Sequence, residues 1–206
     1  MRIIGGREAG LRIATPKGQG VRPTQDRVRE AIFNRLAANI VGATVLDLFS
    51  GTGAMGLESV SRGAANVLSI EKSAQHGRTI EQNIKVCGYN RDQIQLRIGC
   101  AFSALRHLVE SQQSFDLIFA DPPFGDKTTN QRSKSMTQIL LDDPNLLAIA
   151  KINTLIIVGH ASRDKVEISD EWNMAKQKKY GDATINFITK QPKFLAPHIP
   201  NEKGQE

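Results

Sequence analysis

From residue 44 onward, short apolar runs alternate with amphipathic stretches. The apolar runs predict five strands, "TVLDLF", "NVLSIE", "QIQLRI", "FDLIFA" and "TLIIVGH". Helices are predicted between them, over residues 53–62, 73–86, 101–110 and within 133–150. This alternation is typical of right-handed βαβ units, so we expect an α/β fold whose mostly parallel sheet is covered by helices on both faces.

Both ends of the chain depart from this pattern. Residues 1–22 alternate weakly and are broken by glycine and proline, which predicts a short β-ribbon. A helix is predicted in "RPTQDRVREAIFNRL", with Thr24 as N-cap and a buried stripe of Val28, Ile32 and Leu36. Further on, "AKQKKY" and "ATINFITK" flank Gly181-Asp182, which predicts a hairpin and an antiparallel sheet edge.

Composition narrows the class of protein. The chain has 206 residues, 40% of them apolar, which suits one domain of ordinary size. No segment approaches the ~20 apolar residues of a membrane span, and "MRIIGGREAG" lacks the apolar region of a signal peptide. Two cysteines are too few for a disulfide framework, and no Cys/His cluster has metal-ligand spacing. We therefore expect a cytoplasmic monomer without a metal or a membrane partner.

Charge is concentrated at the start of the chain. The net charge is +6 and the pI is near 9.5. Through residue 35 there are eight basic and three acidic residues, so +5 of the excess lies there. Such a patch attracts a polyanion, because each neutralised phosphate releases counterions. A solvated face that only aids solubility explains the charge equally well.

A glycine turn follows the first predicted parallel strand. "LDLFSGTGAMG" contains a G-x-G-x-x-G made by Gly51, Gly53 and Gly56, which alone fits several ligands. Asp47 places a carboxylate where a dinucleotide would place its pyrophosphate, and it suits the positively charged S-adenosylmethionine better. Glu71, 18 residues past Gly53, suits a ribose diol in either kind of site. Alternatively, Asp47 only caps the turn and Glu71 pairs with Lys72.

A second motif, "ADPPFG", follows the fourth predicted strand. Two prolines stiffen the loop that presents Asp121, the Pro122 carbonyl and the Phe124 ring. Two acceptors and an aromatic face suit methylation of an exocyclic amine on a planar base, because they orient the amine lone pair and fix the ring plane. The alternative is a proline-rich turn with an incidental aromatic residue.

These motifs resemble a known family. From "RIIGG" to "KKYGDATINFI" the chain resembles class I S-adenosylmethionine-dependent methyltransferases, and more narrowly the RsmD-type 16S rRNA guanine-N2 methyltransferases. "RPTQDRVREAIFNRL" is the most specific part, whereas "LDLFSGTGAMGLESVSRGA" and "DPPF" are shared with wider methyltransferase groups. The resemblance implies a Rossmann-like fold and methyl transfer to a guanine in 16S rRNA, either naked or in a small-subunit assembly intermediate.

The resemblance also implies roles for individual residues and segments. The cofactor would be held by Asp47, Phe49, Ser50, Gly51, Gly53, Glu71, Lys72, Cys100 and Ala101. The target base and amine would be held by Asp121, Pro122, Pro123 and Phe124. RNA would be held by Arg2, Arg7, Arg12, Arg22, Arg27 and Arg29. The corresponding parts are residues 1–40, a ribbon and helix that bind RNA; 41–190, the methyltransferase domain; and 191–206, a tail expected to be disordered.

Two positions depart from the family pattern. Cys100 stands where these enzymes usually carry an acidic residue that accepts a hydrogen bond from adenine, and Gly159 stands where they usually carry Glu. Three other functions are consistent with the motifs: methylation of adenine N6 in DNA, methylation of a glutamine amide in a protein, and RNA binding without methyl transfer.

Overall fold

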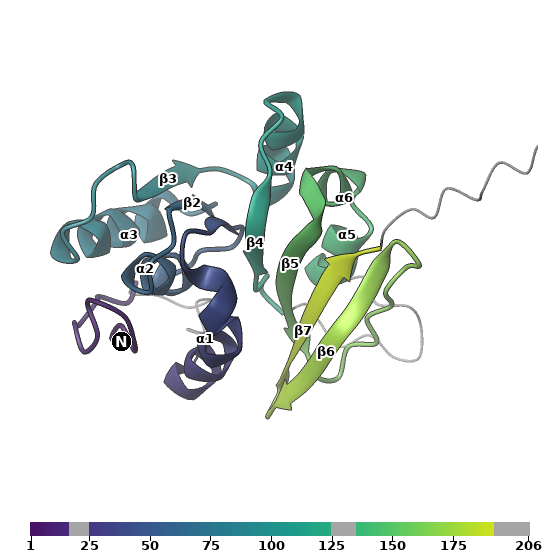
Figure 1. Cartoon of the computed structure of the whole chain (residues 1–206), viewed down its shortest axis with the longest axis horizontal. Coiled ribbons are helices and arrows are strands. Elements are labelled where there is room, and N and C mark those ends of the chain that lie inside the picture. Colours follow the sequence, from purple (N-terminus) through teal and green to yellow (C-terminus); the bar gives the residue numbers. More distant parts are fainter. Residues whose placement is uncertain (17–24, 125–134, 192–206) are drawn as a thin grey trace, which may run out of the picture.

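The computed structural model describes residues 1–16, 25–124 and 135–191 (Figure 1). Their strands form a seven-stranded sheet of order β3-β2-β1-β4-β5-β7-β6. The strands are β1 (Thr44–Asp47), β2 (Asn66–Glu71), β3 (Ile94–Ile98), β4 (Phe115–Ala120), β5 (Ala150–Ala161), β6 (Trp172–Tyr180) and β7 (Ala183–Lys190). The helices are α1 (Asp26–Ile40), α2 (Ala54–Ser61), α3 (Ala74–Val86), α4 (Ala101–Glu110), α5 (Met136–Leu141) and α6 (Pro144–Ile149).

Strands β1 to β5 pair with one another in parallel, and the hairpin β6–β7 adds an antiparallel edge next to β5. The predicted fold class is thereby confirmed. After β1 the chain moves outward to β2 and β3, and it then returns to the other side of β1 with β4. A crevice forms at such a reversal, beyond the carboxyl ends of the strands. The ends of β1 and β4 are therefore the expected place for chemistry.

Helices cover both faces of the sheet, as the alternation along β1 requires (Figure 1). Val45 joins one apolar cluster, with Phe33 of α1 and Leu57 of α2. Its neighbour Leu46 joins the other, which holds apolar residues of α4, α5 and α6. The two clusters fix the sheet rigidly, so that loops at its carboxyl edge start from defined positions.

Several boundaries differ from the predicted ones. The N-cap of α1 is Gln25, without a side-chain cap bond, whereas the predicted cap Thr24 lies outside the described residues. The single helix expected within 133–150 is two helices. They are separated because Asp143 caps a new helix by accepting from the Asn145 N–H at 2.8 Å, with Pro144 in its first turn. The expected disorder of the tail falls almost wholly on residues 192–206, which are also outside the described part.

Residues 1–16 form less β-structure than the ribbon predicted over residues 1–22, whose last part, 17–22, lies outside the described residues. Residues 1–13 contain a single antiparallel bridge, between Arg2 and Arg12. The segment is instead held against α2, because the buried Glu58 carboxylate accepts from the Ile4 N–H at 2.7 Å and from the Gly5 N–H at 2.8 Å. Ile3 is buried in the same cluster as Phe33, so this segment shares a core with the sheet.

Two properties of the described residues bear on the expected partners. None of their helices combines the length and the apolar character that crossing a membrane requires. No group of three or more His, Cys, Asp or Glu side chains in these ranges could hold a metal ion.

Candidate functional site

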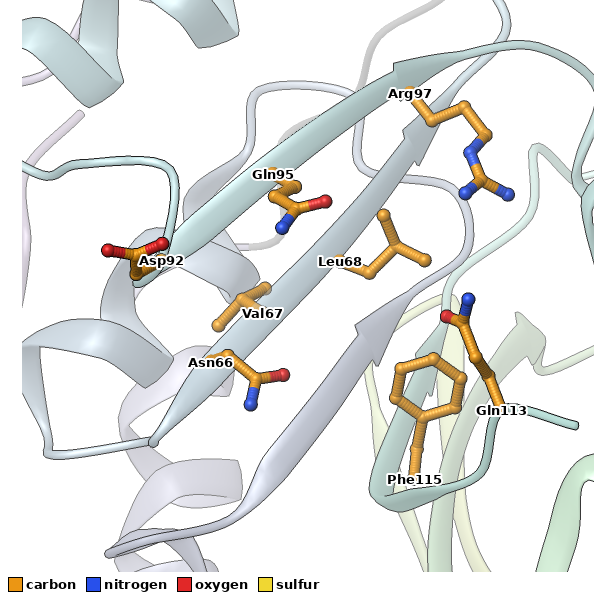
Figure 2. Close-up of a pocket in the computed structure, with 8 residues that line it drawn as sticks. All are labelled: Asn66, Val67, Leu68, Asp92, Gln95, Arg97, Gln113 and Phe115. Atoms are coloured by element: carbon orange, nitrogen blue, oxygen red, sulfur yellow. The ribbon is translucent and has the colours of Figure 1, made fainter. Parts of the chain in front are cut away.

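Two of the hollows on the described part of the molecule lie at different ends of the sheet. The smaller one, of about 300 Å³, is shown in Figure 2. It is bordered by Asn66 and Phe115, the first residues of β2 and β4, together with polar side chains such as Gln95 and Arg97. Ligands of open α/β sheets bind at the carboxyl ends of the strands, and this hollow lies at the opposite side.

The larger cavity, of about 590 Å³, lies at the carboxyl ends. It unites the segments that follow β1, β2, β3 and β4. Of the predicted cofactor and base contacts, it is lined by Asp47, Phe49, Ser50, Gly51, Glu71, Lys72, Cys100, Ala101, Asp121, Pro122, Pro123 and Phe124. Sequence motifs that lie up to 77 residues apart, from Asp47 to Phe124, therefore form one site.

Gly53 does not line this cavity, and the structure gives it another role. It is the N-cap of α2 with a φ of 76°, a left-handed conformation that favours glycine. A Cβ there would also lie 3.0 Å from the Ile80 side chain. Gly56 allows close packing of helix on strand, because its Cβ would lie 2.8 Å from the Ser69 Oγ of β2. These two glycines of the motif shape the turn, and Gly51 is the one that faces the cavity.

Asp47 is a buried acid of the site with a strongly raised pKa. Its carboxyl is buried, and its Oδ2 atom has no hydrogen-bond partner among the described residues. Burial raises the pKa of Asp47 to about 7, against hydrogen bonds from Ser50 and the Gly56 N–H that lower it. The charges of Glu71 and Asp121, which line the same cavity, raise this pKa further.

This arrangement decides between the two ligands considered from the sequence. Three neighbouring carboxylates repel a pyrophosphate and attract a cation. In addition, the Gly51 N–H, which a dinucleotide site would direct at a phosphate, donates to Glu71 Oε2 at 2.8 Å. The unpartnered Asp47 Oδ2 is the acceptor that a cationic amino-acid moiety needs. The residues therefore fit S-adenosylmethionine.

Glu71 is anchored by backbone rather than by Lys72. Besides Gly51, its carboxylate accepts from the Ser73 N–H at 2.8 Å, and His76 Nδ1 lies 3.3 Å from its Oε1. A carboxylate has about four lone-pair positions, so acceptor capacity remains for a ribose hydroxyl. Glu71 is held where the sequence predicted a ribose contact, and its orientation is fixed before any ligand binds.

The far end of the cavity is formed by the start of α4. Cys100 is the N-cap of this helix and is exposed. The Ser103 backbone N–H is the largest influence on its thiol and lowers the pKa of Cys100. Phe49 and Phe102 meet edge to face, with ring centroids 6.3 Å apart, and supply apolar walls. The departure from the family pattern at Cys100 thus lies on the wall where an adenine is expected.

At the other end, the "DPPF" loop leaves β4 beside β5. Pro122 is buried, whereas Asp121 is exposed and Phe124 half-buried. Gly159 of β5 lies against Asp121, since a Cβ on this glycine would come within 2.3 Å of Asp121 Oδ1. The Thr137 hydroxyl donates to the Gly159 carbonyl at 2.9 Å and fixes this part of β5. The second departure from the family pattern is therefore in contact with the predicted catalytic acid.

Sequence reasoning missed part of the cavity wall. Among the lining residues that it missed are Gln25, Val28, Ile32, His76, Phe102, Met136, Gly159, Tyr180, Ala183 and Ile185. A signal existed for the last three. In an antiparallel hairpin added to a parallel sheet, the end of β6 and the start of β7 lie at the same edge as the carboxyl ends of the parallel strands.

The predicted RNA-binding arginines fall into three groups. Arg2, Arg7, Arg12 and Arg27 are exposed, and Arg22 lies outside the described residues. Arg29 is fully buried, and its guanidinium donates to the Arg2 carbonyl at 2.6 Å and to Asp26 at 3.0 Å. The prediction that Arg29 binds RNA is wrong, because its position on the inner side of α1 makes it a structural residue.

Three features define a class I S-adenosylmethionine-dependent methyltransferase: the strand order, the cavity lined by carboxylates, and the stiff loop Asp121–Phe124, which we call the acceptor loop. The family model described as "Conserved hypothetical protein 95" matches residues 1–189, and the chain belongs to this family. The resemblance drawn from the sequence is thereby confirmed.

Individual relatives agree with this assignment. The chain is 30% identical to Ribosomal RNA small subunit methyltransferase D of Escherichia coli K12, over 93% of this chain and 90% of that protein. It is 29% identical to the solved structure of yhhF from Escherichia coli, with a TM-score of 0.72 and coverage of 93% and 98%. The fold also matches SMU.776, solved in complex with SAH, with a TM-score of 0.66, 20% identity and coverage of 82% and 50%.

Proposed function

We propose that the protein transfers a methyl group from S-adenosylmethionine to the N2 amine of a guanine in 16S rRNA. The observation that carries this proposal is that one cavity holds both Asp47, with its unpartnered oxygen, and the Asp121–Phe124 loop. A site for a cationic donor and a site for a planar amine are therefore adjacent. The name of the Escherichia coli relative, a small-subunit rRNA methyltransferase, supports rRNA as the substrate.

The donor, when bound, supplies a methyl group made electrophilic by its sulfonium. Asp47 attracts its positive charge, Glu71 accepts from its ribose, and the start of α4 contacts its base. Each of these residues lies on the wall of the same cavity. Phe49, Phe102 and the loop backbones shield parts of this cavity from water. The attraction between Asp47 and the donor cation therefore acts in a medium of lower dielectric constant than bulk water.

The acceptor loop positions the amine. Asp121 and the Pro122 carbonyl accept from the two N–H bonds, so that the nitrogen lone pair faces the donor, and Phe124 stacks on the base. The N–C bond would form as the bond between the methyl carbon and the sulfonium sulfur breaks, which leaves S-adenosylhomocysteine, a neutral thioether. The amine loses a proton in this step, and we assign the exposed Asp121 carboxylate as its acceptor. The rate then comes from positioning and charge, without a covalent enzyme intermediate.

The proposed RNA contacts are the exposed arginines Arg2, Arg7, Arg12 and Arg27. Arg2 Nε lies 3.5 Å from Asp26 and Arg7 pairs with Glu8, so the patch is partly neutralised locally. Arg12 and Arg27 form no ion pair among the described residues and remain available to phosphate.

The test is transfer of a labelled methyl group to 16S rRNA, naked and in assembled subunits, followed by mass spectrometry of the modified nucleoside. We expect N2-methylguanosine from the wild type and a loss of about a hundredfold or more for Asp121→Asn, with S-adenosylmethionine still bound in calorimetry. Asp92→Asn, an exposed acid beside the smaller hollow, is the matched control and should remain active. N6-methyladenosine as the product, or full activity of Asp121→Asn, would refute the proposal.

A further inference from the structure

The register of the β6–β7 hairpin places two lysines and a tyrosine on one face. Lys176, Lys178 and Tyr180 pair with Phe187, Ile185 and Ala183 respectively. Directly opposite residues of an antiparallel pair project on the same side of the sheet. Phe187 and Ile185 belong to the apolar cluster under α1, so the three β6 side chains lie on the α1 side of the sheet.

The other wall of this region is α1. Its exposed Arg27 and Arg35 are eight residues apart, which places them on one helix stripe with Ala31 between them. The stripe faces the hairpin, because the Arg35 guanidinium carbon lies 5.2 Å from the centroid of the Phe187 ring. In Figure 1, α1 and β7 lie next to each other in the lower half of the molecule.

This region continues into the site. Gln25, Val28 and Ile32 of the α1 segment line the large cavity, and so do Tyr180, Ala183 and Ile185 of the hairpin. The same cavity contains Asp121 and Phe124. An extended ligand that reaches the acceptor loop between α1 and the β6–β7 hairpin would pass four exposed cationic side chains. They are Arg27, Arg35, Lys176 and Lys178.

We propose that this groove between α1 and the β6–β7 hairpin binds the single-stranded RNA that flanks the target guanine, with Tyr180 stacking on a neighbouring base. The inference rests on the proposed function in taking RNA as the substrate. A guanine whose N2 must enter a cavity has to leave its base stack, and this costs least in an unpaired strand, so we take an unpaired strand as the occupant. Its phosphates meet the four cations, and an aromatic ring beside a cationic track is the usual platform for such a strand.

Lys178 lies beside the ring proposed to stack on a base, so phosphate binding and base stacking would occur at adjacent positions in the groove. Its ammonium lies 5.3 Å from the centroid of the Tyr180 ring, so one face of the wall presents a cation and an aromatic ring together. Between residues 172 and 190 there are four lysines and one aspartate, a net charge of +3. Lysines on an edge strand also prevent aggregation, but that task is indifferent to which face carries them.

Lys179 provides a matched control for Lys178, because it tests whether the face that carries the lysine matters. It is exposed and lies on the same strand as Lys178, but it pairs with Thr184 and projects to the opposite face. The test measures binding of a 16S rRNA transcript between about 50 and 200 mM salt. For Lys176→Ala with Lys178→Ala, we expect about tenfold weaker binding and a log–log salt slope reduced by about 1.4, or roughly 0.7 for each phosphate that is no longer neutralised. Lys178→Ala alone should show about half of that reduction, and Lys179→Ala should bind like the wild type.

The tyrosine is tested separately. Tyr180→Leu should weaken RNA binding about tenfold with little change in salt slope, whereas Tyr180→Phe should retain binding because the ring remains. S-adenosylmethionine affinity of every variant should match that of the wild type, which shows that the site is folded. Equal losses for Lys178→Ala and Lys179→Ala, or wild-type binding by Tyr180→Leu, would overturn the groove. These readouts are of binding, so a wild type that binds RNA through the groove and methylates none would refute the proposed function alone.

Discussion

Gly159 leaves the space in which the Asp121 carboxylate lies. A Cβ on this glycine would come within 2.3 Å of Asp121 Oδ1 and 3.1 Å of its Cγ. Gly159→Ala should therefore displace the carboxylate from the acceptor loop while leaving the donor end of the cavity in place. We expect kcat to fall by about a hundredfold, the scale of losing one positioned polar group, and S-adenosylmethionine affinity to stay within about twofold.

A purely structural effect of Gly159→Ala is distinguishable from displacement of Asp121. In the background of Asp121→Ala the clash is absent, so adding Gly159→Ala should cost nothing further in rate. Equal effects of Gly159→Ala in both backgrounds would show that the glycine acts through β5 and not through the carboxylate.

The pKa of Asp47, raised to about 7, predicts that donor binding depends on pH. Below pH 7 the free protein holds Asp47 protonated, and a cationic ligand must expel that proton to gain the ion pair. Affinity for S-adenosylmethionine should thus rise by up to about tenfold per pH unit toward pH 7 and level off above it. Calorimetry in buffers of different ionisation enthalpy should show proton release at pH 6 and little at pH 8.

Asp47→Asn isolates the contribution of this carboxyl from that of the other ionisable side chains of the cavity wall, which include Glu71, His76 and Asp121. The variant should bind the donor more weakly and with a nearly flat pH profile. If its profile stays as steep as that of the wild type, the proton belongs to another group.

The parts of the site that follow predicted strands were accessible from the sequence. Asp47 lies near the end of the predicted strand "TVLDLF" and Asp121 directly follows "FDLIFA", and parallel strands bring such ends together whatever the loops do. The cavity between the carboxyl ends of β1 and β4 follows from that rule. The strand boundaries were close because apolar runs and turn residues are local signals.

What could not be predicted depends on contacts between distant segments. From the sequence, Arg29 was predicted to lie with the other arginines on the exposed side of the helix. Only the docking of residues 1–13 on α2 brings the Arg2 carbonyl to its guanidinium. The role of Gly159 likewise requires the pairing of β4 with β5, which brings it beside Asp121. A sequence pattern records which residues are apolar, and it does not record which partner fills a given space.

Cys100 offers a gain of function. It is the N-cap of α4, and an oxygen acceptor there is preferred over sulfur for both the helix N–H groups and an adenine amine. Cys100→Asp should raise the unfolding free energy by about 1 kcal/mol, from capping and the helix dipole, and should tighten S-adenosylmethionine binding about fivefold. Cys100→Ser, which caps without a charge, should reproduce much of the stabilisation. Weaker donor binding by Cys100→Asp would show that the adenine does not contact this position.

Arg27 and Arg29 form a matched pair on α1, two residues apart, with opposite surroundings. Arg27 is exposed, whereas Arg29 is buried against Asp26 and the Arg2 carbonyl. Arg27→Ala should leave the unfolding free energy within about 0.5 kcal/mol of the wild type and should lower the salt slope of RNA binding by about 0.7. Arg29→Ala should instead lower the unfolding free energy by about 2 kcal/mol, because the side chain no longer packs under α1 and the carbonyl is left without its donor, with an unchanged salt slope for the folded protein. Denaturant titration and RNA binding on the same samples separate the two, and a reduced salt slope for Arg29→Ala would mean that its guanidinium reaches phosphate after all.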